Sequence, residues 1–317
     1  MRVTDIVFQS PEHVIEEVRA MNVKGGSPFG RAAAWAFHLA CEQERFDSIQ
    51  ALRGRLDDIA GQLKALKPTM ATIANSKLLV DKRLDSLGEG ISPAQAAAEI
   101  ARLCGKMIEH SFDAVDRLGA LGANLIEDHM TVMMHSYSST LMSVFEQAAA
   151  KGTRFRVICT ESRPLRESRL AARMLSGWGV PVLYITDAEI WEFMPEADLI
   201  IMGADTIAWN GSVANKMGTA MVSHLALSCK KSVYIASELF KLDCRTAGGF
   251  PVTLERRTAA EVVSSEDFGG SSGIEVINQF FDLTPAWQIA GLITEYGVIP
   301  PVSVGAYWAK FEEELFS

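Results

Sequence analysis

The sequence predicts an α/β protein in which a helical N-terminal domain, residues 1–125, precedes a Rossmann-like parallel-sheet domain, residues 126–317. Two observations support this prediction. Up to about residue 125, apolar residues recur three and four positions apart, which is the period of amphipathic helices. After residue 128, short apolar runs alternate with helical stretches, which is typical of a parallel sheet covered on both faces.

Three helices stand out in the first half of the chain. An alanine-rich helix is expected at 32–40, after a glycine-containing turn at 24–31. The apolar residues from Ile49 to Leu66 keep the helical spacing, and those from Ile100 to Leu118 keep it again. Ser92 followed by Pro93 resembles a helix N-cap with proline in the first turn, so we expect the third helix to begin there.

In the second half, apolar runs predict strands at 130–134, 155–160, 180–185, 199–202 and 232–236, and helices at 138–150, 165–178 and 214–229. Ligands bind such sheets outside the carboxyl ends of the strands. The residues that follow each run are therefore site candidates. They are His135, Ser136, Tyr137, Ser138, Thr160, Glu161, Ser162, Arg163, Asp187, Asp205, Ser237, Glu238 and Lys241.

The chemistry of these strand ends suits a phosphorylated polyol. Arg163 and Lys241 can offset phosphate charge, and Asp205 can accept sugar hydroxyls or move a proton. The alternative is that the ends are polar only because loops face water, with His135 a structural residue. The sequence contains no serine-hydrolase elbow, dinucleotide-binding glycine motif or phosphate-binding lysine loop.

Two glycine-rich segments remain. Residues 24–31 carry Lys24, Gly25 and Gly26 ahead of a helix, where backbone amides can hold an anion. The same composition also fits a flexible turn. The second segment, 269–273, is expected to be a surface loop or the tip of a lid.

Composition excludes several classes of function. The net charge of −9 argues against a broad grip on nucleic-acid phosphates, and no stretch approaches the roughly 20 apolar residues that span a bilayer. The five cysteines include no CxxC pair and no metal-ligand spacing with histidine. They predict reduced intracellular thiols that bind no metal. We expect a cytoplasmic protein that works without a cofactor. The cysteines are Cys41, Cys104, Cys159, Cys229 and Cys244.

The most distinctive segment runs from Met202 to Thr219. Its GADTI at 203–207, NG at 210–211 and NKMGT at 215–219 resemble the signature of the family that joins aldose-1-phosphate isomerases to the α, β and δ subunits of translation initiation factor 2B. Further segments resemble that family from about residue 14 to 305. They are KGG at 24–26, GRAAA at 30–34, KPT at 67–69, TESRP at 160–164, ASELFK at 236–241, TP at 284–285 and ITEYGVIPP at 293–301.

The resemblance implies a sugar phosphate bound between the two domains, and a homodimer or higher assembly built through the C-terminal domains. It implies that Asp205 is the acid/base aspartate. It also implies that Lys24 stands where the family usually has arginine, which keeps the charge and loses the bidentate geometry. The implied substrate-binding residues are Lys24, Gly25, Gly26, Lys67, Arg163, Asn215, Lys216 and Lys241.

One position departs from the isomerase pattern. Where the isomerases carry a cysteine after the first sheet strand, this chain has Ser136, whose hydroxyl is far less acidic than a thiol. Two hypotheses follow. The chain is an isomerase of aldose 1-phosphates to ketose 1-phosphates, of the ribose-1,5-bisphosphate type, with Asp205 and Ser136 as catalytic candidates. Alternatively, it is a non-catalytic regulatory subunit, like initiation factor 2B α, that binds a sugar phosphate or nucleotide.

Other residues bear on the choice between these hypotheses. The intact Asp205, Asn215, Lys216 and Lys241 favour the enzyme, whereas Ser136 and the neighbouring Tyr137-Ser138 favour the regulatory subunit. Cys159, near the end of the second strand, either replaces the missing thiol or is a buried structural residue.

Overall fold

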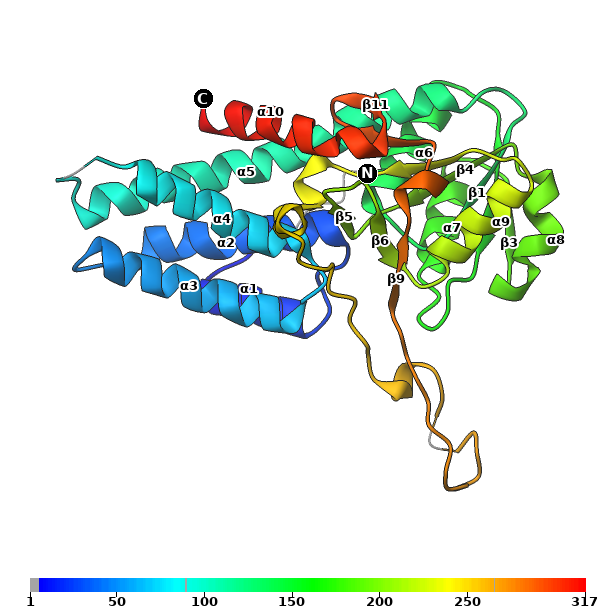
Figure 1. The fold of residues 1–317 in the computed structure, drawn as a ribbon, viewed down its shortest axis with the longest axis horizontal. Helices are drawn as coiled ribbons and strands as arrows, with labels where there is room; N and C mark the ends of the chain where they lie inside the picture. Colours follow the sequence, from blue (N-terminus) through cyan, green and yellow to red (C-terminus); the bar gives the residue numbers. More distant parts are fainter. Residues whose placement is uncertain (1–5, 89, 265) are drawn as a thin grey trace.

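Five helices form the N-terminal half of the computed structural model, which describes residues 6–88, 90–264 and 266–317 (Figure 1). The predicted helical domain is confirmed over these residues, and residues 1–5 of its range lie outside them. The helices are α1 Pro11–Arg19, α2 Gly26–Gln43, α3 Ile49–Leu66, α4 Ala71–Ser86 and α5 Pro93–Gly122.

Local sequence sets where these helices begin and which face they bury. Helix α3 starts after Ser48, whose hydroxyl accepts the Ala51 N–H, and the middle of its apolar stripe, from Leu52 to Leu63, is fully buried. Helix α5 starts at the predicted cap, where Ser92 and Gln95 form a reciprocal capping box. These confirmed starts align the helices on one shared core.

The second half forms a Rossmann-like sheet of seven strands in the order β11-β10-β7-β4-β1-β2-β3. All neighbours pair in parallel except β10 with β11. The five predicted strands are confirmed, and the two C-terminal strands were not anticipated. The strands are β1 Thr131–Met134, β2 Arg156–Thr160, β3 Val182–Ile185, β4 Leu199–Gly203, β7 Val233–Ala236, β10 Gly291–Thr294 and β11 Gly297–Ile299.

Helices cover both faces of this sheet (Figure 1). Successive residues of a strand point to opposite faces, so Val132 joins one apolar cluster and Met133 the other. Helices α6 Ser139–Ala150 and α7 Ser168–Gly177 pack in the first cluster with the end of α5. Helices α8 Ile190–Phe193, α9 Thr219–Ser228 and α10 Val304–Phe316 pack in the second, which continues into the helical half.

The predicted helix at 214–229 is wrong at its start. Residues Val213–Lys216 form β6 of a second, four-stranded sheet, and the helix begins only at Thr219. Gly218, with φ +107°, separates the two elements. The second sheet has the order β8-β5-β6-β9, with β5 Thr206–Ala208, β8 Leu242–Asp243 and β9 Phe281–Thr284.

The turn predicted at 24–31 is also shorter than expected. Helix α2 already begins at Gly26, because Gly25 at φ +94° provides the left-handed turn and the following residues are helical. Gly30 and Arg31 therefore belong to the helix. Within it, Gly30 allows close packing, since an added Cβ would lie 2.8 Å from Phe240.

A long segment, residues 249–278, leaves the body of the molecule and returns, and we call it the arm (Figure 1). Its described residues, 249–264 and 266–278, form neither a strand nor an α-helix. Its two ends pair at the root, through a bridge between Arg256 and Gln279. The predicted loop at 269–273 lies in this arm.

The last helix returns to the N-terminal half. Helix α10 lies along α5 (Figure 1), and Glu312 on α10 forms an ion pair with Lys82 on α4. The division of the chain near residue 125 remains a prediction. In the described ranges, every helix is too short or too polar to cross a bilayer.

Glu295, in the turn between β10 and β11, makes the free energy of unfolding depend on pH. Burial raises its pKa to about 8, although both carboxylate oxygens accept the Leu239 N–H. Between pH 4.5 and 8 the folded state keeps a proton that the unfolded state releases, so stability falls as pH rises, by at most about 1.4 kcal/mol per pH unit. We expect Glu295→Gln to flatten that fall in urea unfolding at pH 5 and 8.

The exposed residue Glu313 on α10 supplies the control for this prediction. Glu313→Gln removes an exposed carboxylate that is not among the groups acting on Glu295, so the pH slope should stay as in the wild type. An unchanged slope in Glu295→Gln would contradict the assignment of the effect to the buried carboxyl.

Candidate functional site

A cavity of about 520 Å³ lies at the carboxyl edge of the main sheet, walled on its other side by the helical half. Six of the ten residues predicted for the site line it. They are Lys24, Gly25, Lys67, Ser136, Asp205 and Lys216. The sequence therefore predicted the location of the cavity, although these residues come from distant parts of the chain.

Asp205 follows β4 and points its carboxylate at the cavity. Its backbone N–H donates to the Ala214 carbonyl, 3.0 Å away, which fixes the turn into the second sheet. In the described part of the chain, no group donates a hydrogen bond to the carboxylate. Burial raises the pKa of Asp205, and the charges of Lys241 and Lys216 oppose that rise. The carboxylate is thus left free to bind or deprotonate a ligand.

Lys216, at the end of β6, is held by two neighbours. Its ammonium forms an ion pair with Glu167 and lies 3.1 Å from the centre of the Phe280 ring. Burial lowers the pKa of Lys216, and the Glu167 carboxylate counteracts this effect. The second oxygen of Glu167, Oε2, is buried and has no hydrogen-bond partner among the described residues. A hydrogen-bond acceptor, Glu167 Oε2, is therefore available to a ligand beside Lys216.

Ser136 sits in a strained backbone conformation on the cavity wall. Its φ is +66°, and two other non-glycine residues nearby, Ser162 and Arg166, also have positive φ. The Ser136 N–H donates to Ser162 Oγ over 2.7 Å, which holds the left-handed turn in place. Such conformations cost of order 1–3 kcal/mol and persist where the surroundings enforce them. The loops after β1 and β2 are thus fixed at the cavity.

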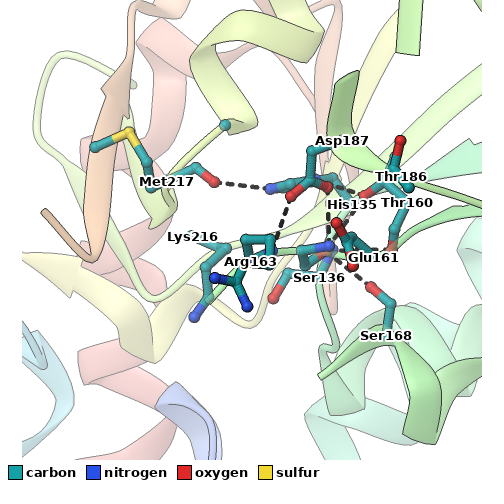
Figure 2. A network of polar contacts seen from close by, with 12 residues as sticks. His135, Ser136, Thr160, Glu161, Arg163, Ser168, Thr186, Asp187, Lys216 and Met217 are labelled. Carbon is teal, nitrogen blue, oxygen red and sulfur yellow. Dashed lines mark hydrogen bonds and ion pairs between the residues drawn. The ribbon is translucent and has the colours of Figure 1, made fainter. Parts of the chain in front are cut away.

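His135 is a structural residue beneath this loop, as its isolation in the sequence suggested. Its Nδ1 lies 2.7 Å from Thr160 Oγ1 and its Nε2 lies 2.9 Å from the Met217 carbonyl (Figure 2). The carbonyl can only accept, so Nε2 carries the proton and Nδ1 accepts from the threonine. Burial lowers the pKa of His135. With both nitrogens engaged, the ring cannot act as a base for Ser136.

Four predicted residues lie behind or beside the cavity instead of lining it. Lys241 is buried, and its ammonium donates to the Ala204 carbonyl over 2.8 Å. Gly26 packs against it, since an added Cβ would lie 2.9 Å from Lys241 Cε. The Asn215 amide donates to Thr219 Oγ1. These three support the wall around Asp205.

Arg163 is the fourth, and it points toward the arm. Its backbone N–H donates to Asp187, and its guanidinium donates to the Val262 carbonyl, 2.9 Å away. The neighbouring Glu161 forms an ion pair with Arg166, at 3.1 Å. The substrate-binding role of Arg163 remains a prediction.

The helical half contributes cationic side chains. The Lys67 ammonium lies 5.4 Å from the centre of the Phe29 ring and is almost completely buried. Burial lowers the pKa of Lys67, and the Glu255 carboxylate partly offsets that shift. Lys24 and Gly25 border the cavity at the start of α2. Together they give this wall the charge that a phosphate needs.

Several lining residues were missed in the sequence. Arg166 precedes α7, and Arg169 and Arg173, four residues apart, lie on one side of that helix. The spacing of Arg169 and Arg173 could have revealed these two residues. Glu255, Arg257 and Phe280 come from the root of the arm, where no regular period marks them.

Cys159 does not replace the missing thiol. It is fully buried in the sheet, outside the lining of the cavity, and burial raises its pKa to about 12. In the residues that the structure describes, no group of three His, Cys, Asp or Glu side chains could hold a metal ion. The site offers cations for phosphate, carboxylates for hydroxyls, and carboxyl groups for proton transfer.

Known proteins resemble this chain over most of its length. The model of the initiation factor 2 subunit family matches residues 22–301. The chain is 33% identical to ribose 1,5-bisphosphate isomerase of Pyrococcus furiosus over 294 residues, covering 91% of this chain and 90% of that one. It is 32% identical to methylthioribose-1-phosphate isomerase of Geotalea uraniireducens, covering 92% and 87%.

A solved structure shows the same fold. The translation initiation factor eIF-2B of Pyrococcus horikoshii superimposes with a TM-score of 0.78 at 26% identity, covering 92% of this chain and 97% of that one. The similar proteins thus include both isomerases and a translation factor.

Proposed function

Because the chain belongs to the initiation factor 2 subunit family, we propose that it is a sugar-phosphate isomerase that converts an aldose 1-phosphate, of the ribose 1,5-bisphosphate type, into the ketose 1-phosphate. The observation that carries the proposal is the free carboxylate of Asp205 in a cavity with cationic walls. A carboxylate without a partner can take a proton from carbon, whereas one held in an ion pair is already engaged.

The distribution of charge supports a substrate with two phosphates. Lys24 and Lys67 approach from the helical half, and Arg166, Arg169 and Arg173 approach from the start of α7. Phosphate is bound well by arginine forks and by lysine ammonium groups. A bisphosphate would satisfy both groups of cations, whereas a monophosphate would leave one group without an anion.

The hydroxyls of the sugar also find acceptors in this cavity. Glu167 and Glu255 each have one buried carboxylate oxygen without a hydrogen-bond partner among the described residues. A buried acceptor without a hydrogen bond destabilises the folded protein by about 1–3 kcal/mol. Ligand hydroxyls would satisfy both oxygens, which supports a polyol as the substrate.

A second candidate function is favoured by Ser136, which follows the first sheet strand, where the resemblance implies a cysteine in the isomerases. Under that hypothesis the cavity binds a sugar phosphate or nucleotide without turnover, and the chain is a regulatory subunit. The enzyme is favoured because the Asp205 carboxylate has no hydrogen-bond partner among the described residues. A site that only binds a ligand does not require such a carboxylate.

Turnover and binding measured together test the proposed function. The compounds are ribose 1-phosphate, ribose 5-phosphate, ribose 1,5-bisphosphate and methylthioribose 1-phosphate. NMR measures product formation, and calorimetry measures binding. We expect ketose product with at least one 1-phosphate. Saturable binding without product from any of them contradicts the isomerase and favours the regulatory subunit.

Ser136→Cys separates the two hypotheses further. We expect the variant to bind the preferred compound within about threefold of the wild type and to change kcat by less than about tenfold, because the proposed proton transfer does not depend on this side chain. If the wild type forms no product and Ser136→Cys does, the expectation is contradicted. The wild type would then be an isomerase that has lost its catalytic cysteine. Ser138→Cys, two residues further on and outside the cavity lining, is the control.

The remaining expectations belong to the same proposal. We propose a homodimer or higher homo-oligomer in the cytoplasm that works without a cofactor. Mass measurement in solution tests the assembly directly.

A further inference from the structure

We propose that Glu255 is the second proton carrier of this site and works with Asp205 on the same substrate. The inference rests on the proposed function and deepens it, because isomerisation needs two proton carriers and Ser136 lacks a base. Glu255 was absent from the sequence prediction. It belongs to the arm and is far in the sequence from the strand ends, and folding brings it to the cavity.

The backbone around Glu255 is held on two sides. Its N–H donates to Thr69 Oγ1 over 3.1 Å, which attaches the root of the arm to the turn between α3 and α4. Its carbonyl accepts the Phe280 N–H over 3.3 Å, which attaches it to the residue before β9. Both contacts fix the main chain while leaving the side chain directed at the cavity that it lines.

The carboxyl group of Glu255 is only partly satisfied by the protein. Its Oε2 is buried and has no hydrogen-bond partner in the described ranges. A buried oxygen without a donor favours the protonated form of the acid, because the charged form loses its hydration. The group is therefore suited to hold a proton until a substrate arrives.

The charges that face Glu255 come from three parts of the fold. They are Lys67 after α3, Asp205 after β4, and Arg257 and Glu261 on the arm itself. Burial raises the pKa of Glu255, the two cations oppose this, and the two carboxylates add to it. A bound phosphate dianion would offset Lys67 and Arg257, and would thereby strengthen the preference for the protonated form.

Asp205 and Glu255 thus form a pair of carboxyls facing one cavity. The charge of Asp205 makes ionisation of Glu255 less favourable, as like charges at a shared site do. Asp205 lies near Lys216 and Lys241, which favour its ionised form. We assign the base role to Asp205 and the acid role to Glu255, because separated protonation states of two carboxyls define an acid and a base.

The proton balance of the reaction matches two carriers. Conversion of a cyclic aldose 1-phosphate removes the proton from C2, breaks the bond between C1 and the ring oxygen, and places a proton on that oxygen. The enol that results loses its C2 hydroxyl proton and gains a proton at C1, so no oxidant or reductant is required. Asp205 carries the carbon proton from C2 to C1. Glu255 gives its proton to the ring oxygen and recovers one from the C2 hydroxyl.

Glu255→Gln tests this assignment, because it keeps the shape of the side chain and removes the transferable proton. We expect kcat with the preferred 1-phosphate to fall about 100-fold, while calorimetric binding stays within about threefold. The pH profile adds a second readout. The wild type should lose activity at high pH as Glu255 deprotonates, and the variant should lack that decline.

Glu275→Gln is the matched control, because Glu275 lies on the same arm, is exposed and does not line the cavity. Its kcat should remain within about threefold of the wild type. Normal kcat in Glu255→Gln, or an equal loss in Glu275→Gln, overturns the inference while the proposed function stands. A wild type that binds every compound and turns over none overturns both.

Discussion

Asp205→Asn is expected to lower kcat by about 1,000-fold or more with the preferred 1-phosphate, since the amide cannot accept a proton from carbon. Binding should change little, because the cations that hold phosphate are untouched and the amide retains the volume of the carboxylate. The carboxylate has no hydrogen bond to lose within the described residues, so folding should be unaffected. Single-turnover kinetics and calorimetry on the same preparation measure both quantities.

Asp198→Asn provides the comparison, because Asp198 lies at the opposite edge of the sheet, where it accepts the Thr131 N–H at 2.9 Å. The same chemical change there should leave kcat within about twofold. If Asp205→Asn kept more than a tenth of the wild-type kcat, proton transfer by this carboxylate would be refuted. A joint loss of binding and turnover would instead indicate a role in holding the substrate.

Gly218→Ala is expected to lower the free energy of unfolding by about 2–4 kcal/mol. Gly218 has φ +107°, and an added Cβ would lie 2.8 Å from His135 Nε2. The strained backbone adds roughly 1–2 kcal/mol, and the overlap displaces a ring whose two nitrogens are engaged. Urea unfolding followed by circular dichroism measures the loss.

Gly249→Ala distinguishes the two contributions. Gly249 has φ +84°, and an added Cβ would meet nothing within 4 Å, so only the backbone cost of about 1 kcal/mol remains. Equal losses in the two variants would show that contact with His135 adds nothing to the effect.

The order of helices and strands was largely accessible from the sequence, because burial on one or two faces leaves a period in the apolar residues. The strand at Val213–Lys216 escaped because it is short and runs directly into Gly218 and the next helix. A run of four residues cannot distinguish a strand from the first turn of a helix. The arm at 249–278 escaped because its described residues have no regular period.

The site was accessible only where it follows a strand. Ser136 and Asp205 were predicted because the carboxyl ends of parallel strands share one edge. Whether a side chain lines the cavity or supports its wall depends on rotation about single bonds, so Lys241 was placed too close to the ligand. Glu255 and Arg257 reach the cavity through long-range contacts of the arm, which no local pattern encodes.

The cavity draws its walls from segments as far apart as Lys24 and Phe281. A fragment of the gene therefore cannot encode a complete cavity. A premature stop, a frameshift or a fission anywhere between these two codons removes part of the wall, whereas a duplicated gene retains all of it. Divergence that keeps the cavity must therefore leave the chain from Lys24 to Phe281 intact.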